Sequence, residues 1–229
     1  MNLILFYHPL ASFCWKVQIA LGENATPFKG EIVNLADREA SARFLDLWPV
    51  GKMPVLRDET RDRTIPETSI IIEYLDRYYP GAQPLLPRDE EQRLDARLWD
   101  RFFDLYVQAP MQRIVSDRLR EPAQRDSLAV SEASATLRMA YDMIERQLAV
   151  KSWIAGTDFS IADCAAFPAL FYAGTLVAYA DDHPLTAAYF DRLCARDSVQ
   201  RVIADAQPWF HFYPFSEAIP ERFLSAPLK

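Results

Sequence analysis

Residues 52–56, Lys-Met-Pro-Val-Leu, decide the fold of this chain, together with Glu67-Thr68 about a dozen residues later. A proline that follows a bulky residue and directly precedes a strand favours a cis peptide bond. Such a bond would turn the Met53 backbone amide and carbonyl outward, where an extended peptide can pair with them. The pattern therefore predicts an exposed peptide-binding edge at the start of a strand.

Glu67 and Thr68 stand at the head of an apolar helical stretch that continues through residues 69–75. The first turn of a helix carries unpaired backbone N–H groups and the positive end of the helix dipole. Such an end holds a carboxylate, and a nearby glutamate holds an ammonium. Together with residues 52–56, this arrangement predicts a site for a small anionic peptide, and glutathione is the peptide we expect.

Four segments of the chain resemble the cytosolic glutathione S-transferases of the bacterial type, with the class left open. They are residues 6–21, 48–56, 67–75 and 159–163. Each segment is weak alone, but their order and spacing make the resemblance specific, and it extends from residue 3 to about residue 205. It implies glutathione as co-substrate, a small apolar electrophile as second substrate, and a homodimer.

Composition limits the kinds of partner. The chain has 229 residues, half of them hydrophobic, and a formal net charge of −7. This charge argues against nucleic acid as the main partner. No apolar run reaches bilayer length and the first residues lack a basic leader, so we expect a cytoplasmic protein without membrane contact.

Metal, dithiol and nucleotide chemistry find no support in the sequence. Cys14, Cys164 and Cys194 form no Cys-x-x-Cys pair, and the three histidines are scattered. The six glycines make no Gly-x-Gly or Gly-Lys-Ser motif. We therefore expect no metal site and no nucleotide-binding loop.

The predicted fold has two domains. Helix breakers are dense over residues 80–87, between two helical patterns. We expect a thioredoxin-like domain over residues 1–82 with a mixed four-stranded sheet and helices, a linker over 83–91, and an all-α bundle with an aromatic tail over 92–229. Strands are expected at 3–7, 29–33, 55–58 and 63–65, with a helix at 13–23.

Helical spacing supports the second domain. Apolar residues recur at this spacing in two stretches, namely Leu94, Leu98, Phe102, Leu105 and Tyr106, and later Leu137, Tyr141, Ile144 and Leu148. Ser160 and Asp163 have the spacing of a capping box at the start of another helix. We expect that box to stabilise the fold without taking part in chemistry.

The end of the first strand is where thiol chemistry is expected. Ser12 precedes the predicted helix, so its hydroxyl and the first helical N–H groups could donate hydrogen bonds to a glutathione thiolate. Ser12 could equally serve only as a helix cap. The position that carries the catalytic Ser or Cys in several classes of the family falls on Ala11, and Tyr7 resembles the tyrosine that other classes use.

Cys14 is the second catalytic candidate. At a helix start the dipole would lower the pKa of its thiol if the thiol faced the site, allowing a mixed disulfide with glutathione. Its helical spacing with Val17, Gln18 and Leu21 favours a buried structural thiol instead. Two functions other than conjugation thus stay open, a glutathione-dependent thiol transferase or isomerase, and a non-catalytic ligand-binding or interaction scaffold, which Ala11 favours.

Binding residues follow from the resemblance. It implies that Glu67 and Thr68 hold the γ-glutamyl group, that the Met53 backbone before Pro54 pairs with the cysteinyl segment, and that Lys52 meets the glycyl carboxylate. The electrophile is expected against apolar and aromatic side chains between the domains. Candidates are Phe13, Trp15, Phe102, Tyr106, Met111 and the aromatic tail 209–215.

Overall fold

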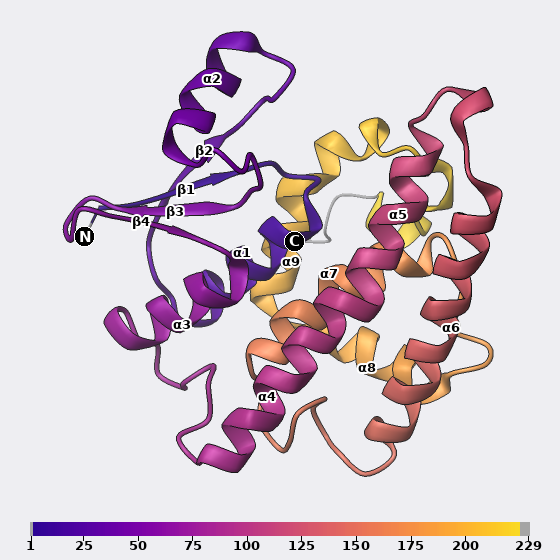
Figure 1. Cartoon of the computed structure of the whole chain (residues 1–229). Helices are drawn as coiled ribbons and strands as arrows, with labels where there is room; N and C mark the ends of the chain where they lie inside the picture. The colour runs from indigo at the N-terminus through magenta and orange to yellow at the C-terminus, as the bar shows by residue number, and fades with distance from the viewer. Residues whose placement is uncertain (1, 225–229) are drawn as a thin grey trace.

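The computed structural model describes residues 2–224, so the two ends of the expected domain ranges, residues 1 and 225–229, lie outside the description. The N-terminal part is built on a four-stranded mixed sheet in the order β2-β1-β3-β4, in which β1 runs parallel to β2 and antiparallel to β3 (Figure 1). The strands are β1 (Leu3–Tyr7), β2 (Lys29–Ile32), β3 (Val55–Asp58) and β4 (Arg63–Pro66). The expected strands agree with these to within one residue.

Helices cover both faces of the sheet. α1 (Ser12–Glu23) and α3 (Thr68–Tyr78) lie on one side and α2 (Arg38–Leu47) on the other (Figure 1). Leu3 and Leu5 alternate into the main core, as the period of a strand requires. The sequence did not predict α2, because Phe44 is the only buried residue of that charged helix.

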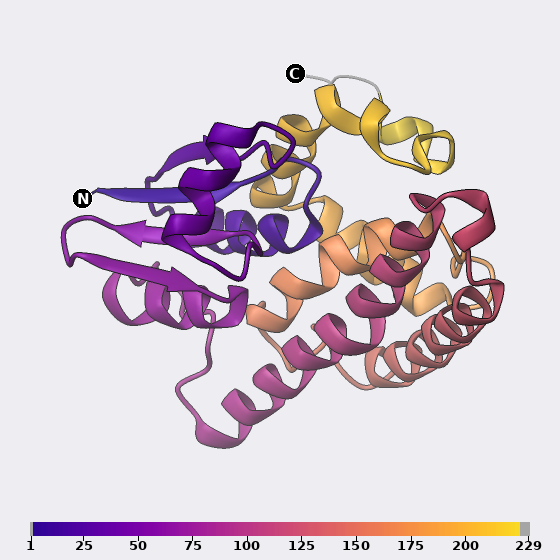
Figure 2. The same ribbon diagram turned by 45° about the horizontal axis from the view of Figure 1, so that its top comes forward.

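The C-terminal part is helical. A long rod consists of α4 (Glu90–Phe102), a π-helical segment (Phe103–Gln108) and α5 (Ala109–Arg118). The remaining helices are α6 (Ser127–Leu148), α7 (Ile161–Gly174), α8 (Pro184–Cys194) and α9 (Asp197–Ala206), followed by short 3₁₀ turns. Figure 2 shows α9 beside the sheet domain and the yellow turns that follow it running on over the helical part.

α7 is the buried centre of the helical part. Every residue from Ile161 to Ala173 is buried. The expected capping box is present at its start, where the Asp163 carboxylate accepts the Ser160 backbone N–H at 2.8 Å. Asp163 also accepts a hydrogen bond from the Tyr189 hydroxyl, so this cap ties α7 to α8.

The helix predicted from residues 94–106 is present, but most of the apolar residues that predicted it lie on its exposed face. Of the five apolar residues that predicted this helix, Phe102 is buried, whereas Leu94 and Leu98 are 63% and 60% exposed. The buried face consists of Ala96, Trp99, Phe103 and Val107. Both sets have helical spacing, and spacing alone does not tell which of two apolar stripes meets the core. In α6, by contrast, Leu137, Tyr141, Ile144 and Leu148 are all buried.

The two parts meet along α1. Trp15 is fully buried against α7, with ring centroids 5.9 Å from Phe167 and 5.0 Å from both Phe171 and Tyr172. The next residue, Lys16, is also fully buried and pairs with carboxylates of the rod. This packing fixes the start of α1 relative to the helical part, and a cavity opens there.

Candidate functional site

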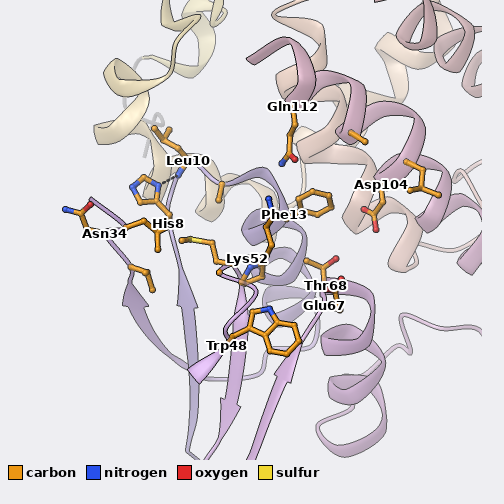
Figure 3. Close-up of a pocket in the computed structure, with 18 of the residues that line it drawn as sticks. His8, Leu10, Phe13, Asn34, Trp48, Lys52, Glu67, Thr68, Asp104 and Gln112 are labelled. Atoms are coloured by element: carbon orange, nitrogen blue, oxygen red, sulfur yellow. Dashed lines mark hydrogen bonds between the residues drawn. The ribbon is translucent and has the colours of Figure 1, made fainter. Parts of the chain in front are cut away.

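A cavity of about 790 Å³ lies between the sheet part and the rod. Its walls come from the loop between β1 and α1, the loop after β2, residues 48–54, the start of α3 and one face of the rod (Figure 3). Five binding residues expected from the sequence line it, namely Lys52, Met53, Pro54, Glu67 and Thr68. Segments that are distant in sequence are therefore neighbours here.

The Met53–Pro54 peptide bond is cis, as expected. β3 begins directly after it, with Val55 paired to Phe6 of β1 and to Pro66 of β4. The short strand ladder thus places Met53 beside the chain that leads into α3.

Glu67 and Thr68 form the start of α3. Glu67 is the N-cap residue and has a φ of 67°, in the left-handed region that non-glycine residues rarely adopt. Its side chain makes no capping hydrogen bond, while its carbonyl accepts the Ile71 N–H at 2.8 Å. The carboxylate is therefore free for another partner at the cavity wall, and backbone strain of this kind is concentrated at functional sites.

Lys52 is exposed and points into the cavity (Figure 3). No salt bridge involves its ammonium among the residues that the structure describes. Trp48 and Gly51 line the same wall, and Gly51 has a φ of 69°, so the loop turns there at a residue that tolerates this conformation. Lys52 is the cation that this loop offers to a ligand.

At the start of α1, Ala11 and Phe13 line the cavity, whereas Ser12 does not. Ser12 lines an adjoining side cavity of about 270 Å³, together with Met111, Tyr172 and Phe212. Leu10, Ala11 and Gln112 line both cavities, so the two are contiguous. Tyr7 lines neither cavity, and burial raises the pKa of its hydroxyl.

Cys14 is fully buried inside α1. Burial raises the pKa of its thiol to about 12, although a hydrogen bond involving the His8 backbone opposes that change. The thiol does not face the cavity, so the condition under which the helix dipole would activate it is not met. Cys164 and Cys194 are buried as well.

The sequence did not single out several polar residues of the cavity. His8 is half-buried, its Nδ1 accepts the Leu10 N–H at 3.2 Å, and burial lowers its pKa. Its ring stands edge-on to Trp209, with centroids 5.3 Å apart. Arg101, Asp104 and Gln112 come from the rod. No local pattern marks these three, because only the packing of the two parts brings them to the cavity.

The aromatic candidates for the electrophile wall separate into three groups. Phe13 lines the main cavity, and Met111 with residues 212–214 of the tail lines the side cavity. Trp15 and Phe102 are buried in the core and line neither cavity, and Tyr106 is exposed outside them. The side cavity thus offers the apolar and aromatic surface that this part of the chain was expected to supply.

Within residues 2–224, no three His, Cys, Asp or Glu side chains gather closely enough to hold a metal ion. In the same range, no helix combines the length and apolar character that a membrane span needs.

The architecture, a thioredoxin-like sheet domain followed by a helical domain with a cavity between them, defines a class of proteins with known members. Residues 5–83 match the family model for the glutathione S-transferase N-terminal domain, and residues 102–197 match that for the glutathione S-transferase C-terminal domain. The chain belongs to the glutathione S-transferase family.

Some similar proteins are named as glutathione S-transferases, and one is named for its localisation with FtsZ. The chain is 30% identical over 218 residues to FtsZ-localized protein A of Caulobacter vibrioides, covering 89% of this chain and 92% of that one. It is 25% identical over 193 residues to glutathione S-transferase GstB of Escherichia coli, covering 82% and 91%. A glutathione S-transferase from Methylobacterium radiotolerans, solved in complex with glutathione sulfonate, is 25% identical with a TM-score of 0.78, covering 88% and 94%.

Proposed function

We propose that this chain is a glutathione transferase that binds glutathione in the main cavity and adds its thiolate to an apolar electrophile. Glutathione is the co-substrate of the family to which the chain belongs. The observation that carries the proposal is that Lys52, Met53, Glu67 and Thr68 line one cavity beside the start of α1. Lys52 and Glu67 carry charges opposite to those of a carboxylate and an ammonium of glutathione.

The division of roles is the one that the family resemblance implies, and the charges of the residues support it. Unpaired N–H groups at the start of α3 receive the γ-glutamyl carboxylate, and the free Glu67 carboxylate attracts the ammonium. The Met53 backbone pairs with the cysteinyl segment, and Lys52 meets the glycyl carboxylate. A ligand held at both ends places its thiol between them, near Ala11.

Thiol activation is assigned to the start of α1. A free thiol of this kind has a pKa of about 8.5, and a helix N-terminus lowers it. The amides of Ser12 and Phe13 belong to the first turn of α1, where N–H groups have no intrahelical partner. The Ser12 hydroxyl lies next to them in the contiguous side cavity and is the side-chain donor we propose.

Binding and activation are measured together by an ultraviolet difference titration of bound glutathione from about pH 5 to 9. We expect the bound thiol to ionise below the free value. Glu67→Ala should weaken binding about tenfold or more, as expected for losing a charged hydrogen bond. Glu91→Ala, an exposed carboxylate in the first turn of α4, is the matched control and should bind normally. Equal affinity of Glu67→Ala and the control would refute the assignment.

The electrophile is proposed to occupy the side cavity. Its wall of Met111, Val115, Phe212 and Tyr213 suits an aromatic or other apolar group. Turnover of an aromatic halide or an epoxide with glutathione is the assay, and conjugate formation that depends on both substrates is expected.

We also propose a homodimer in the cytoplasm. Leu94, Leu98 and Leu105 of the rod and Ile70 of α3 are large apolar side chains that are each about half exposed or more. Exposed apolar surface of this kind marks interaction sites. A second copy covering these residues is the proposed occupant, and light scattering gives its mass. The proposed cytoplasmic location is tested by fractionating cells and finding which fraction contains the protein.

A scaffold function is the second candidate, and two observations favour it. Ala11 brings no hydroxyl or thiol to the cavity, and one relative is by name an FtsZ-localized protein. The chain would then bind glutathione or another ligand without turnover and associate with FtsZ. Cosedimentation of the purified protein with FtsZ filaments tests this, and glutathione-dependent turnover without cosedimentation would exclude it. The thiol transferase is less favoured, because all three cysteines are buried.

A further inference from the structure

Hydrogen bonds fix the backbone of the loop between β1 and α1, which lines the main cavity with His8 and Leu10. The peptide unit between Pro9 and Leu10 has both of its polar groups paired. Its carbonyl, on Pro9, accepts the Trp15 indole N–H at 2.5 Å. Its N–H, on Leu10, donates to His8 Nδ1 at 3.2 Å (Figure 3). Rotation of this unit would therefore break two hydrogen bonds.

The next peptide unit, between Leu10 and Ala11, is paired in the same way. The Ala11 N–H donates to the His8 carbonyl at 3.0 Å. The Leu10 carbonyl accepts the hydroxyl of Tyr172, also at 3.0 Å. Tyr172 belongs to α7, so this last hydrogen bond comes from the helical domain, 162 residues away in sequence.

The Tyr172 side chain is a rigid donor. It is 2% exposed, and its ring lies against those of Trp15, Phe171 and Tyr213, with centroids 5.0–5.1 Å apart. Burial raises the pKa of its hydroxyl well above the usual range, so the group stays protonated around neutral pH. A buried hydroxyl without a partner is unfavourable, and the Leu10 carbonyl is the partner it has here.

The paired loop leads directly into the first amides of α1. Ala11 is the N-cap residue of α1, and its carbonyl accepts the N–H groups of Cys14 and Trp15 at 2.8 and 3.3 Å. Within residues 2–224, the N–H groups of Ser12 and Phe13 have no backbone acceptor. They remain for a ligand, and the peptide unit that precedes them sets their direction.

We propose that Tyr172 is a positioning residue for thiol activation, because its hydrogen bond to the Leu10 carbonyl fixes the direction of the first N–H groups of α1. This inference rests on the proposed activation of glutathione at the start of α1. Donors stabilise a developing charge most when they are held in place beforehand. The helical domain thus takes part in activation, although the N–H groups themselves belong to the sheet domain.

The test is the ionisation of glutathione bound to Tyr172→Phe. This substitution removes one oxygen and keeps the buried ring. Ultraviolet difference titration without an electrophile measures the pKa of the bound thiol, so a change in the electrophile wall does not enter. We expect the pKa to rise by about half a unit to one unit, the shift that corresponds to one net hydrogen bond. Glutathione affinity at about pH 5, where the thiol is protonated, should change little.

The pH profile of turnover is the second readout. Below the pKa of the bound thiol, the rate of conjugation follows the fraction of thiolate. In Tyr172→Phe, kcat with an aromatic halide should be about three- to tenfold lower in this range, and the difference should shrink as the pH rises above both pKa values. A merely structural role would lower the amount of folded enzyme at every pH and leave the position of the profile unchanged.

Tyr141→Phe is the matched control. Tyr141 is a fully buried residue of α6 whose hydroxyl donates to the Val177 carbonyl at 3.2 Å, and it lines neither cavity. Urea unfolding should show similar losses of stability in Tyr141→Phe and Tyr172→Phe, but only the second should shift the pKa. If Tyr172→Phe does not fold, Trp15→Phe removes the other side-chain donor to the loop and should shift the pKa in the same direction.

The outcomes separate this inference from the proposed function. A natural chain that does not bind glutathione, or does not lower the pKa of its thiol below the free value of about 8.5, overturns both. A lowered pKa that Tyr172→Phe leaves unchanged, or Trp15→Phe where that variant is used, overturns this inference and leaves the proposed function standing. An equal shift in Tyr141→Phe overturns it as well, since loss of stability would then be the cause. A shift that the control lacks supports both.

Discussion

The Lys16 ammonium lies 2.7 Å from an Asp100 carboxylate oxygen, and almost no surface of either side chain reaches solvent. Lys16 belongs to α1 of the sheet domain and Asp100 to α4 of the helical rod. The pair therefore joins the two parts at the back of the cavity. Replacing either partner alone leaves an unpaired charge in the interior.

Lys16→Met should destabilise the chain strongly. Removing one partner of a buried ion pair costs about 3–5 kcal/mol, because the remaining charge stays buried without compensation. Urea unfolding at neutral pH measures the change in free energy. Arg97→Met is the control, since the side chains of the Arg97–Glu73 pair, 2.8 Å apart, are 48% and 33% exposed, and solvent-exposed pairs contribute about 1 kcal/mol or less. Similar losses in the two variants would contradict the interior role of Lys16.

Glu23 gives a pH-dependent contribution to stability. Burial alone would raise the pKa of its carboxyl, but hydrogen bonds from Arg196 and Ser198 lower it below the ordinary value of 4.5. A group with a lowered folded-state pKa stabilises the fold above the unfolded-state pKa, and this contribution is lost as the pH falls through the folded-state pKa. The contact joins the end of α1 to the start of α9.

Glu23→Gln should therefore lose about 1–2 kcal/mol at pH 7, where the charged hydrogen bonds are present in the natural chain. The difference between the two proteins should shrink as the pH falls below 4.5, the ordinary value for this carboxyl. Urea unfolding at a series of pH values measures it. Glu91→Gln, an exposed change, should show no such trend. A difference that stays constant down to the lowest pH would argue against the ionised contact.

The part of the candidate site that two contiguous motifs form could be predicted from the sequence. Residues 52–54 and 67–68 are contiguous motifs whose chemistry depends on local backbone, a bend before β3 and the start of α3. The part of the cavity wall that the rod contributes could not be predicted in this way. Arg101, Asp104 and Gln112 reach the cavity only through packing of Trp15 and Lys16 against helices that lie far away in sequence.

Much of the fold could also be predicted from the sequence, with the exception of α2 and of the face of the rod that is buried. Strand boundaries agreed most directly in β1 and β3, where consecutive apolar residues lie next to turn signals. α2 was missed since a single buried phenylalanine gives it no apolar stripe. The first helix of the rod was predicted from a spacing to which Leu94 and Leu98 belong, and both are exposed; the stripe that meets the core includes Ala96 and Trp99.

The exposed leucine side chains of the rod lead to a prediction about the assembly of the protein. Leu98→Glu places a charge in the surface proposed for the homodimer, and burying an unpaired carboxylate there would be unfavourable. We expect the variant to be a monomer by light scattering with its unfolding free energy little changed per chain. Leu119→Glu is the control, because Leu119 caps the end of α5 away from α3 and is itself 70% exposed. A monomeric natural chain at micromolar concentration would remove the dimer proposal.

Two residues that line the side cavity should affect different steps, Ser12 the activation of the thiol and Phe212 the binding of the electrophile. Ser12 and Phe212 both line it, but Ser12 begins α1 whereas Phe212 is a largely exposed tail residue. Ser12→Ala should raise the pKa of bound glutathione if its hydroxyl donates to the sulfur, and one unit corresponds to about 1.4 kcal/mol. Phe212→Ala should leave that pKa unchanged and raise the KM for an aromatic electrophile instead. If Ser12→Ala leaves the ionisation unchanged, the backbone amides of α1 provide the activation, and the side chain belongs to the electrophile wall.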